Sequence, residues 1–224
     1  MHPKEDETAD SLNSLKEALN AAWEALEKTN PGTNPGTNPG TNVEPGIQEK
    51  MDAPFIQSAN AVAQKTGVSV KVVVNKVAKA TKYEIYRVFG GKATLVGTTT
   101  GTYVDKGVTK KAIKYYAVAV SADGKTKSVA GTQKAASFGK GTKKVKAKKV
   151  SGKVKVTWKR VKGAKKYVIY RSNKKNGKYT KVGTSKKTSF IHKKAKKGNN
   201  FYKVVVVTKG KVSLMSKASK SVRK

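Results

Sequence analysis

The strongest constraint on this chain is an internal repeat whose copies lie roughly 84 to 87 residues apart. Three segments match in the same order along the two copies. The matched pairs are Tyr83–Arg87 with Tyr167–Arg171, Val96–Thr98 with Val182–Thr184, and Tyr116–Val120 with Tyr202–Val206. Because three ordered matches rarely arise by chance, we expect two copies of one structural unit, a domain at residues 53–138 and a domain at residues 139–224.

Each copy consists of short segments in which apolar and polar residues alternate, separated by turns rich in Gly, Lys and Asn. In the second copy Val154, Val156 and Trp158 alternate with polar residues, and the first copy has Val70, Val72 and Val74 at the equivalent positions. A period of two is typical of strands with one buried face. The pattern predicts two β-sandwiches, with a smaller or rearranged core in the first, where valine replaces tryptophan.

At these segments the chain resembles a pair of fibronectin type III-like domains, and it is most similar to the lysine-rich versions on extracellular proteins of Gram-positive bacteria. The resemblance is carried by Val154–Trp158, Gly163–Arg171 and Phe201–Val204, and it covers residues 53–224. The sequence departs from the family at Ala195–Gly198, where the family often has Leu-x-Pro-Gly. The resemblance implies a spacer, adhesion or accessory module of a secreted or wall-attached protein, and it does not imply an enzyme.

Residues 1–52 differ from the repeats and hold ten of the 13 acidic residues. Within residues 1–29, apolar residues recur every three or four positions, which predicts a short α-helix. Residues 30–52 contain Asn-Pro-Gly-Thr three times in succession, and this predicts a linker because proline and glycine favour turns over regular structure. The predicted fold class is therefore all-β, with two tandem fibronectin type III-like β-sandwiches preceded by a short α-helix and a Pro/Gly linker.

The positive charge of the chain is concentrated in the second copy. The formal net charge is +36, and residues 139–224 contain 31 of the 49 Lys and Arg residues and no Asp or Glu. A charge this large exceeds what solubility requires and indicates a polyanionic partner. Only four of the basic residues are arginines, so bidentate reading of bases or phosphates would have few donors, whereas lysines suit diffuse attraction to a polymer.

Many of these lysines fall on two segments that are neighbouring strands in the expected fold. The candidate polyanion-binding residues are Lys144, Lys146, Lys148, Lys153 and Lys155. Alternation turns many of these side chains to one solvent-facing side, where like charges repel unless an anion neutralises them. The alternative interpretation is a generally cationic surface without a defined site.

Two tyrosines are candidate stacking residues. Tyr86 and Tyr170 fall on the opposite side of their strands from the apolar residues that surround them, and exposed tyrosines on a sheet can stack on sugar rings or bases. The alternative is that they cover the outer face of the strand beside lysine stems.

The sequence offers few groups for catalysis or for metal binding. It has no cysteine, so disulfides, cysteine-bound zinc and thiol chemistry are excluded. The histidines are His2 and His192, and the matching repeat positions of Asp105 and His192 place these two residues in different domains. We therefore expect no enzyme activity, no catalytic or metal-binding residues and no cofactor. No apolar stretch is long enough to insert into a membrane.

Together these features predict a non-catalytic module of a secreted or cell-surface bacterial protein, located in the extracellular space or cell wall. It would act as a spacer or adhesion unit attached electrostatically to anionic polymers such as teichoic acid or acidic polysaccharide, with further domains of a larger protein as partners. Non-specific binding to nucleic acid is a further expectation. Two alternatives remain open, namely an accessory region of a larger carbohydrate-active enzyme and a cytoplasmic nucleic-acid-binding protein, the latter because residues 1–6 lack a signal peptide.

Overall fold

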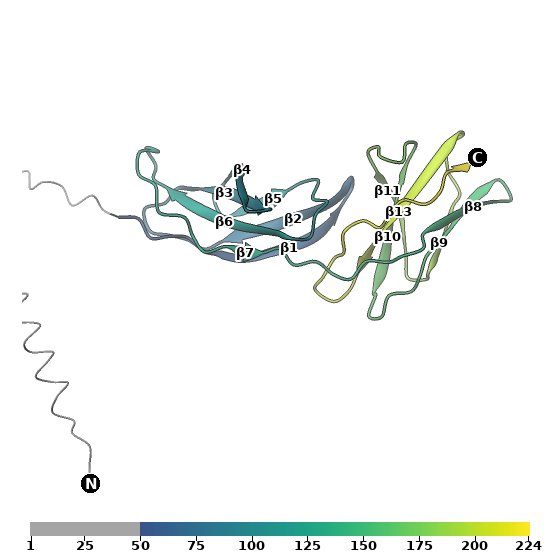
Figure 1. The fold of residues 1–224 in the computed structure, drawn as a ribbon, viewed down its shortest axis with the longest axis horizontal. Helices are drawn as coiled ribbons and strands as arrows, with labels where there is room; N and C mark the ends of the chain where they lie inside the picture. The colour runs from purple at the N-terminus through teal and green to yellow at the C-terminus, as the bar shows by residue number, and fades with distance from the viewer. Residues whose placement is uncertain (1–49) are drawn as a thin grey trace, which may run out of the picture. The chain divides into compact units, whose positions relative to one another are not determined.

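The computed structural model describes residues 50–224, and within this range the secondary structure consists of β-strands without a helix (Figure 1). The helix predicted for residues 1–29 and most of the linker predicted for residues 30–52 lie outside the described residues. In the part of the chain that is described, no helix has the length and apolar character needed to cross a membrane.

The first sandwich contains a three-stranded and a four-stranded antiparallel sheet. Its strands are β1 (Ile56–Gln64), β2 (Gly67–Val74), β3 (Lys82–Phe89), β4 (Lys92–Thr99), β5 (Thr102–Asp105), β6 (Ile113–Val120) and β7 (Lys134–Ala135). The smaller sheet has the order β1-β2-β5, and the larger sheet has the order β4-β3-β6-β7.

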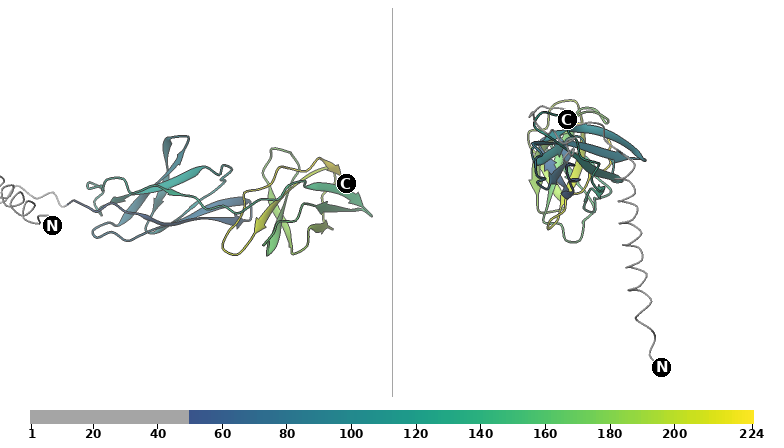
Figure 2. Two further views of the ribbon diagram at one scale, coloured as in Figure 1. Left: turned by 60° about the horizontal axis from the view of Figure 1, so that its bottom comes forward. Right: turned by 90° about the vertical axis from the view of Figure 1, so that its left-hand side faces the viewer.

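The second sandwich repeats this plan. Its strands are β8 (Lys146–Val150), β9 (Lys153–Thr157), β10 (Lys166–Ser172), β11 (Thr180–Ser185), β12 (Ser189–His192), β13 (Asn199–Val207) and β14 (Val222–Arg223). The smaller sheet has the order β12-β9-β8 and the larger one the order β11-β10-β13-β14. The strands of both sandwiches are visible from two further sides in Figure 2.

The two sandwiches have the same strand order when matched in chain sequence, so that β8, β9 and β12 correspond to β1, β2 and β5. A three-stranded sheet packed on a four-stranded sheet in this order is a fibronectin type III-like fold. The predicted fold class, all-β with two tandem fibronectin type III-like sandwiches, is confirmed for the described residues.

The core of the second sandwich forms from the alternating apolar residues recognised in the sequence. Val154 and Val156 of β9 are fully buried, and Trp158 just beyond the strand is 6% exposed. The Trp158 ring lies 5.2 Å from the Tyr167 ring of β10 at an interplanar angle of 57°. Tilted aromatic pairs of this kind add to the stabilisation from burial alone. The prediction that Trp158 lies on the apolar face of its strand is confirmed.

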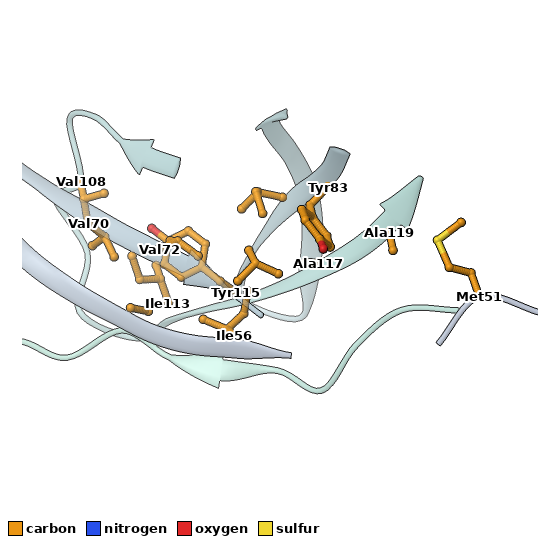
Figure 3. Packing of buried hydrophobic residues seen from close by; sticks show 13 residues of the cluster. Met51, Ile56, Val70, Val72, Tyr83, Val108, Ile113, Tyr115, Ala117 and Ala119 are labelled. Carbon is orange, nitrogen blue, oxygen red and sulfur yellow. The ribbon is translucent and has the colours of Figure 1, made fainter. Parts of the chain in front are cut away.

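In the first sandwich Val74 takes the place of Trp158, and a residue from outside the strands joins the core. Met51 is 5% exposed and belongs to the same buried cluster as Val74 and Tyr83. Figure 3 shows its side chain at the Ala119 end of the cluster. A flexible thioether side chain fills irregular space well. The first sandwich therefore includes Met51, which the sequence prediction had placed in the linker.

The structure corrects one of the three repeat matches. Arg87 lies opposite Tyr115 in the sheet, and Arg171 lies opposite Tyr202. Tyr115 and Tyr202 are both fully buried, so they are the equivalent residues. The sequence match of Tyr116 with Tyr202 is wrong by one residue. Because Tyr115 and Tyr116 are adjacent in β6, residue type alone allows either tyrosine to be matched with Tyr202. The two alignments differ by one residue, and such a shift moves every side chain of the strand to the other face of the sheet.

The glycine in the matched Val-Gly-Thr segments has a packing reason. A Cβ atom on Gly97 would collide with the ring of Tyr103, and one on Gly183 would collide with the ring of Phe190. Both rings belong to the short strand of the smaller sheet, β5 or β12. The repeat keeps glycine there because an aromatic ring lies against the backbone.

A run of serines holds the segment after β13 against that strand. Ser213, Ser216 and Ser219 accept hydrogen bonds through Oγ from the backbone N–H groups of Val206, Val204 and Tyr202, at 2.9, 2.9 and 3.1 Å. Each serine N–H also donates to the carbonyl of the same β13 residue. The hydroxyl groups therefore satisfy buried β13 donors that a regular strand pairing would otherwise satisfy.

Candidate polyanion-binding surface

The candidate lysines lie mainly on the outer side of the sheet β12-β9-β8. Strands β8 and β9 pair antiparallel, with Lys148 directly opposite Lys155 and Lys146 opposite Thr157. Lys146, Lys148, Lys153 and Lys155 are all exposed, and we call these four residues the lysine face. The strand pairing expected from the sequence brings them together on one surface.

The lysine face is oriented by the residues between the lysines. Val154 and Val156 are fully buried, so the alternation of a strand turns Lys153 and Lys155 outward. Two exposed apolar side chains flank the lysines, because Val150 lies opposite Lys153 and Ile191 opposite Lys155. These side chains are 40% and 41% exposed, respectively. The surface therefore combines the ammonium groups of the lysines with exposed apolar side chains that the aliphatic stems of the lysines can cover.

Lys144 does not belong to the lysine face. It lies before β8, in the left-handed backbone region with a φ of 54°. Together with Lys143 and Lys217 it lines a hollow of 490 Å³. Of the five lysines singled out in the sequence, the structure thus brings four onto one sheet surface and places Lys144 at a neighbouring turn.

Within residues 139–224, no carboxylate side chain is present to offset the charges around the lysine face. Residues 139–224 contain no Asp or Glu, whereas the first sandwich pairs Arg87 with Asp105 at 3.0 Å and Lys127 with Glu84 at 2.6 Å. Like charges directly opposite each other on a sheet repel. The second sandwich therefore has no carboxylate side chains of its own to offset its positive surface, whereas the first sandwich partly neutralises its charges internally.

Tyr86 lies on the outer side of β3, as the alternation predicts. Its ring stacks on the ring of Tyr116 with centroids 4.9 Å apart and an angle of 3° between the planes. Its hydroxyl donates a hydrogen bond to Glu84 at 2.9 Å, and this bond raises the pKa of Tyr86. One face of the ring is therefore occupied by protein, and stacking of the other face on a ligand stays a prediction.

Tyr170 is not available for stacking on a ligand, which corrects the sequence prediction. Its side chain is fully buried, and its hydroxyl donates to the carbonyl groups of Gln64 at 2.8 Å and Gly67 at 3.1 Å. Burial raises its pKa to about 12. It packs with Ala61 and Val68 of the first sandwich, so the outer side of β10 serves as a packing surface. Strand alternation reports which side a residue faces, but it does not report what covers that side.

Sequence reasoning also missed a second group of basic residues. Arg171 and His192 line a hollow together with lysines from the loops around β11 and β12. The sequence did contain a signal for this group. Asp105 and His192 occupy matching repeat positions, so an acid in the first copy is replaced by a weak base in the second, while the arginine (Arg87 and Arg171) is present in both.

Among residues 50–224, no three Asp, Glu, His or Cys side chains come together in a group that could hold a metal ion.

Comparison with protein-family models finds no match, and comparison with curated proteins finds none either. Solved structures with related folds do occur. A fibronectin type III-like protein from Clostridium thermocellum is 26% identical, with 36% of this chain and 88% of that chain covered and a TM-score of 0.34. A two-domain fibronectin type III segment of chicken tenascin is 16% identical, with 77% and 100% covered and a TM-score of 0.33. Domains A168–A170 of titin are 18% identical, with 77% and 66% covered and a TM-score of 0.35. At these TM-scores the fold assignment rests on the strand order within each sandwich.

Proposed function

We propose that the chain is a non-catalytic module of a secreted or cell-surface bacterial protein, in which the second sandwich attaches electrostatically to anionic polymers. Teichoic acid and acidic polysaccharide are the expected partners, and the location is extracellular or in the cell wall. The first sandwich acts as a spacer. The observation that carries the proposal is the lysine face, four exposed lysines on paired strands in a region without an Asp or Glu.

Attachment follows from the physics of a charged surface in salt solution. A polyanion that contacts several lysines releases condensed counterions, so its affinity falls as salt rises. Lysine acts as a compact point charge, and a row of lysines therefore attracts many anionic polymers without recognising a sequence. Exposed Val150 and Ile191 let the lysine stems lie on the sheet while their ammonium groups reach the polymer.

The test is to measure binding of the full chain to teichoic acid, heparin and mixed-sequence DNA across a salt series. We expect a linear fall of log affinity with log salt, with a slope that reaches up to about one per lysine contact. Changing Lys146, Lys148, Lys153 and Lys155 to Gln should weaken binding to all three polymers and reduce the slope.

A matched control removes four charges elsewhere in the second sandwich. The variant with Lys162, Lys186, Lys209 and Lys220 changed to Gln loses the same charge from exposed positions that lie outside β8 and β9. Attachment through the lysine face requires the first variant to lose clearly more affinity than this control. Equal losses in both variants would show that only total charge matters, and binding that persists in high salt would exclude electrostatic attachment.

A further inference from the structure

The two sandwiches differ at one equivalent position, the end of the short strand β5 or β12. In the first sandwich, Arg87 Nη1 donates to both oxygens of Asp105, at 3.1 and 3.0 Å, and the Tyr115 hydroxyl donates to Asp105 at 2.6 Å. The Asp105 side chain is almost fully buried. This carboxylate therefore neutralises Arg87 at the rim of the core.

In the second sandwich the corresponding residues are Arg171, His192 and Tyr202. Strand register makes the match, because Asp105 lies opposite Val70 of β2 and His192 lies opposite Val154 of β9. Nδ1 of His192 lies 2.9 Å from the Tyr202 hydroxyl. In the first sandwich, Oδ2 of Asp105 accepts a hydrogen bond from the corresponding Tyr115 hydroxyl at 2.6 Å. An imidazole thus replaces the carboxylate, and the arginine is retained.

Arg171 has only neutral hydrogen-bond acceptors among the contacts that the structure records in residues 50–224. Its Nε donates to Oδ1 of Asn200 at 2.7 Å, and its Nη2 donates to the carbonyl of Asn199 at 3.3 Å. No Asp or Glu exists between residues 139 and 224 to supply a charged partner. Among these contacts, no carboxylate side chain offsets the charge of the Arg171 guanidinium, whereas Asp105 offsets that of Arg87.

Arg171 and His192 line a hollow of 580 Å³ whose other charged residues are all cationic. The hollow is lined by Arg171, Lys178, His192, Lys194, Lys196 and Lys197 together with neutral side chains. These residues come from β10, from the loop before β11, and from the end of β12 and the loop that follows it. Three different segments thus direct positive charge toward one space.

We propose that this hollow binds the tetrahedral oxyanion of a phosphate or sulfate group, which takes the place that the Asp105 carboxylate holds in the first sandwich. The Arg171 guanidinium donates to the oxyanion with its fork of N–H groups, a geometry suited to phosphate and related anions. The surrounding lysines add charge, and the volume leaves room for the organic group that carries the anion.

The proposed pocket is separate from the lysine face. Its residues come from β10, β11, the end of β12 and the adjoining loops, whereas the lysine face lies on β8 and β9. The lysine face attracts a polymer along its length, and the pocket holds one anionic group. The pocket can therefore bind whether or not the lysine face does.

His192 supplies a direct readout of occupancy. Burial lowers its pKa below the ordinary value, and the charges of Arg171 and Lys224 lower it further. The groups that face this side chain are Arg171 of β10, Tyr202 of β13, Lys224 directly after β14 and the lysines of the hollow. A bound anion favours the imidazolium form, so it raises the pKa of His192.

The first experiment titrates the full chain with sodium sulfate at constant ionic strength maintained with chloride, and follows the His192 ring by NMR at several pH values. Sulfate keeps its charge between about pH 5 and about pH 8, so changes in affinity in that range report on the protein. We expect saturable binding, a rise in the pKa of His192 and tighter binding at lower pH. A pKa of His192 that is the same with sulfate and with chloride would overturn the proposal.

The second experiment uses His192→Asp, which restores the residue pattern of the first sandwich. The new carboxylate should pair with Arg171 and reduce sulfate affinity by roughly tenfold or more, while Tyr202 retains an acceptor as Tyr115 does. Arg171→Gln should reduce sulfate affinity as well, and it keeps His192 as the NMR reporter. Binding to both variants as tight as to the original chain would exclude the pocket.

The four-lysine variant of the lysine face provides the control. Its sulfate affinity and its His192 shift should remain unchanged even though its polymer binding falls, so failure of the pocket and failure of the polymer proposal give different results. Dimethyl phosphate and methyl sulfate, which carry equal charge, then distinguish a phosphodiester group from a sulfate ester as the preferred ligand. Loss of sulfate binding in the lysine-face variant would show diffuse attraction in place of a pocket.

Discussion

The two sandwiches share one strand order but differ in how they handle charge at the rim of the core. In the first, Arg87 pairs with buried Asp105. In the second, Arg171 faces His192 and the region has no acid to pair with it. The comparison shows that the strand order can be preserved while the residue at the end of the short strand changes from a carboxylate, Asp105, to an imidazole, His192.

The cores differ as well. Trp158 packs in the core of the second sandwich beyond the end of β9, whereas the first sandwich has Val74 at the corresponding position and adds Met51 from before its first strand. A large aromatic residue concentrates stability in one side chain. The first sandwich has a smaller side chain at this position, and it recruits Met51 from outside the sheets.

The largest effect should come from Trp158→Ala. Removing this buried ring should destabilise the second sandwich by about 3 to 5 kcal/mol, and Val74→Ala should cost the first sandwich less because it removes fewer buried atoms. Chemical denaturation combined with hydrogen exchange of the β9 and β2 amides measures the two sandwiches separately. Trp158→Phe is the control, since it keeps most of the ring. Equal costs for Trp158→Ala and Val74→Ala would contradict the proposed difference between the cores.

The next effect concerns the first sandwich. Asp105→Ala leaves Arg87 and the buried Tyr115 hydroxyl without their acceptor, so the free energy of unfolding should fall by about 1.5 to 3 kcal/mol. Asp123→Ala, at an exposed turn, should leave it nearly unchanged. Denaturant titration measures both variants. If both changes prove equally mild, the charge pair is not a stabilising feature of the first sandwich.

A smaller effect should follow from Ser216→Ala in the second sandwich. The change leaves the N–H of buried Val204 without its side-chain acceptor, at a cost of about 1 to 2 kcal/mol. Ser221→Ala removes a hydroxyl that bonds only at the exposed surface and should be close to neutral. Amide exchange at Val204 should accelerate in the first variant alone. Unchanged exchange there would mean that the serine run does not hold the segment after β13.

The smallest effect is a pH dependence that should distinguish the second sandwich from the first. The folded state lowers the pKa of His192, chiefly through burial, so the unfolded chain binds a proton more readily. The contribution of His192 to the free energy of unfolding is therefore complete at pH values above about 6.5, the pKa of histidine in the unfolded chain. This contribution is lost as the pH falls from that value to the lower pKa of His192 in the folded state. Thermal unfolding at a series of pH values measures this loss. His192→Asn should flatten it, and an unchanged slope in that variant would assign the pH dependence to another group.

Much of the fold could be predicted from residue patterns. The alternation of Val154, Val156 and Trp158 correctly indicated the buried side of β9, because a strand places successive side chains on opposite faces. The same alternation placed Lys153 and Lys155 on the exposed side. The glycine of Val-Gly-Thr was visible as a repeated residue, but its reason, an aromatic ring against the backbone, required the packing of β12 on β11.

The matched register of β6 and β13 could not be predicted, because two adjacent tyrosines fit the pattern in either register and only cross-strand pairing decides between them. Ser213, Ser216 and Ser219 recur every three residues after β13. This spacing was a usable signal for a segment bound to β13, but a search for strands by alternation of period two does not detect it. The candidate site divides in the same way. Four lysines could be assigned to one face from alternation, whereas Lys144 required knowledge of the turn before β8.

The sequence by itself determined the two repeats, their strand character and the concentration of positive charge, because each of these depends on residue type and local spacing. The tertiary structure alone decided that Tyr170 is buried against Gln64 and Gly67, and that Arg171 and His192 share a hollow with distant lysines. Both depend on contacts between segments far apart in the chain. Local spacing sets the direction of a side chain, and only the packing of the remaining chain sets what that side chain meets.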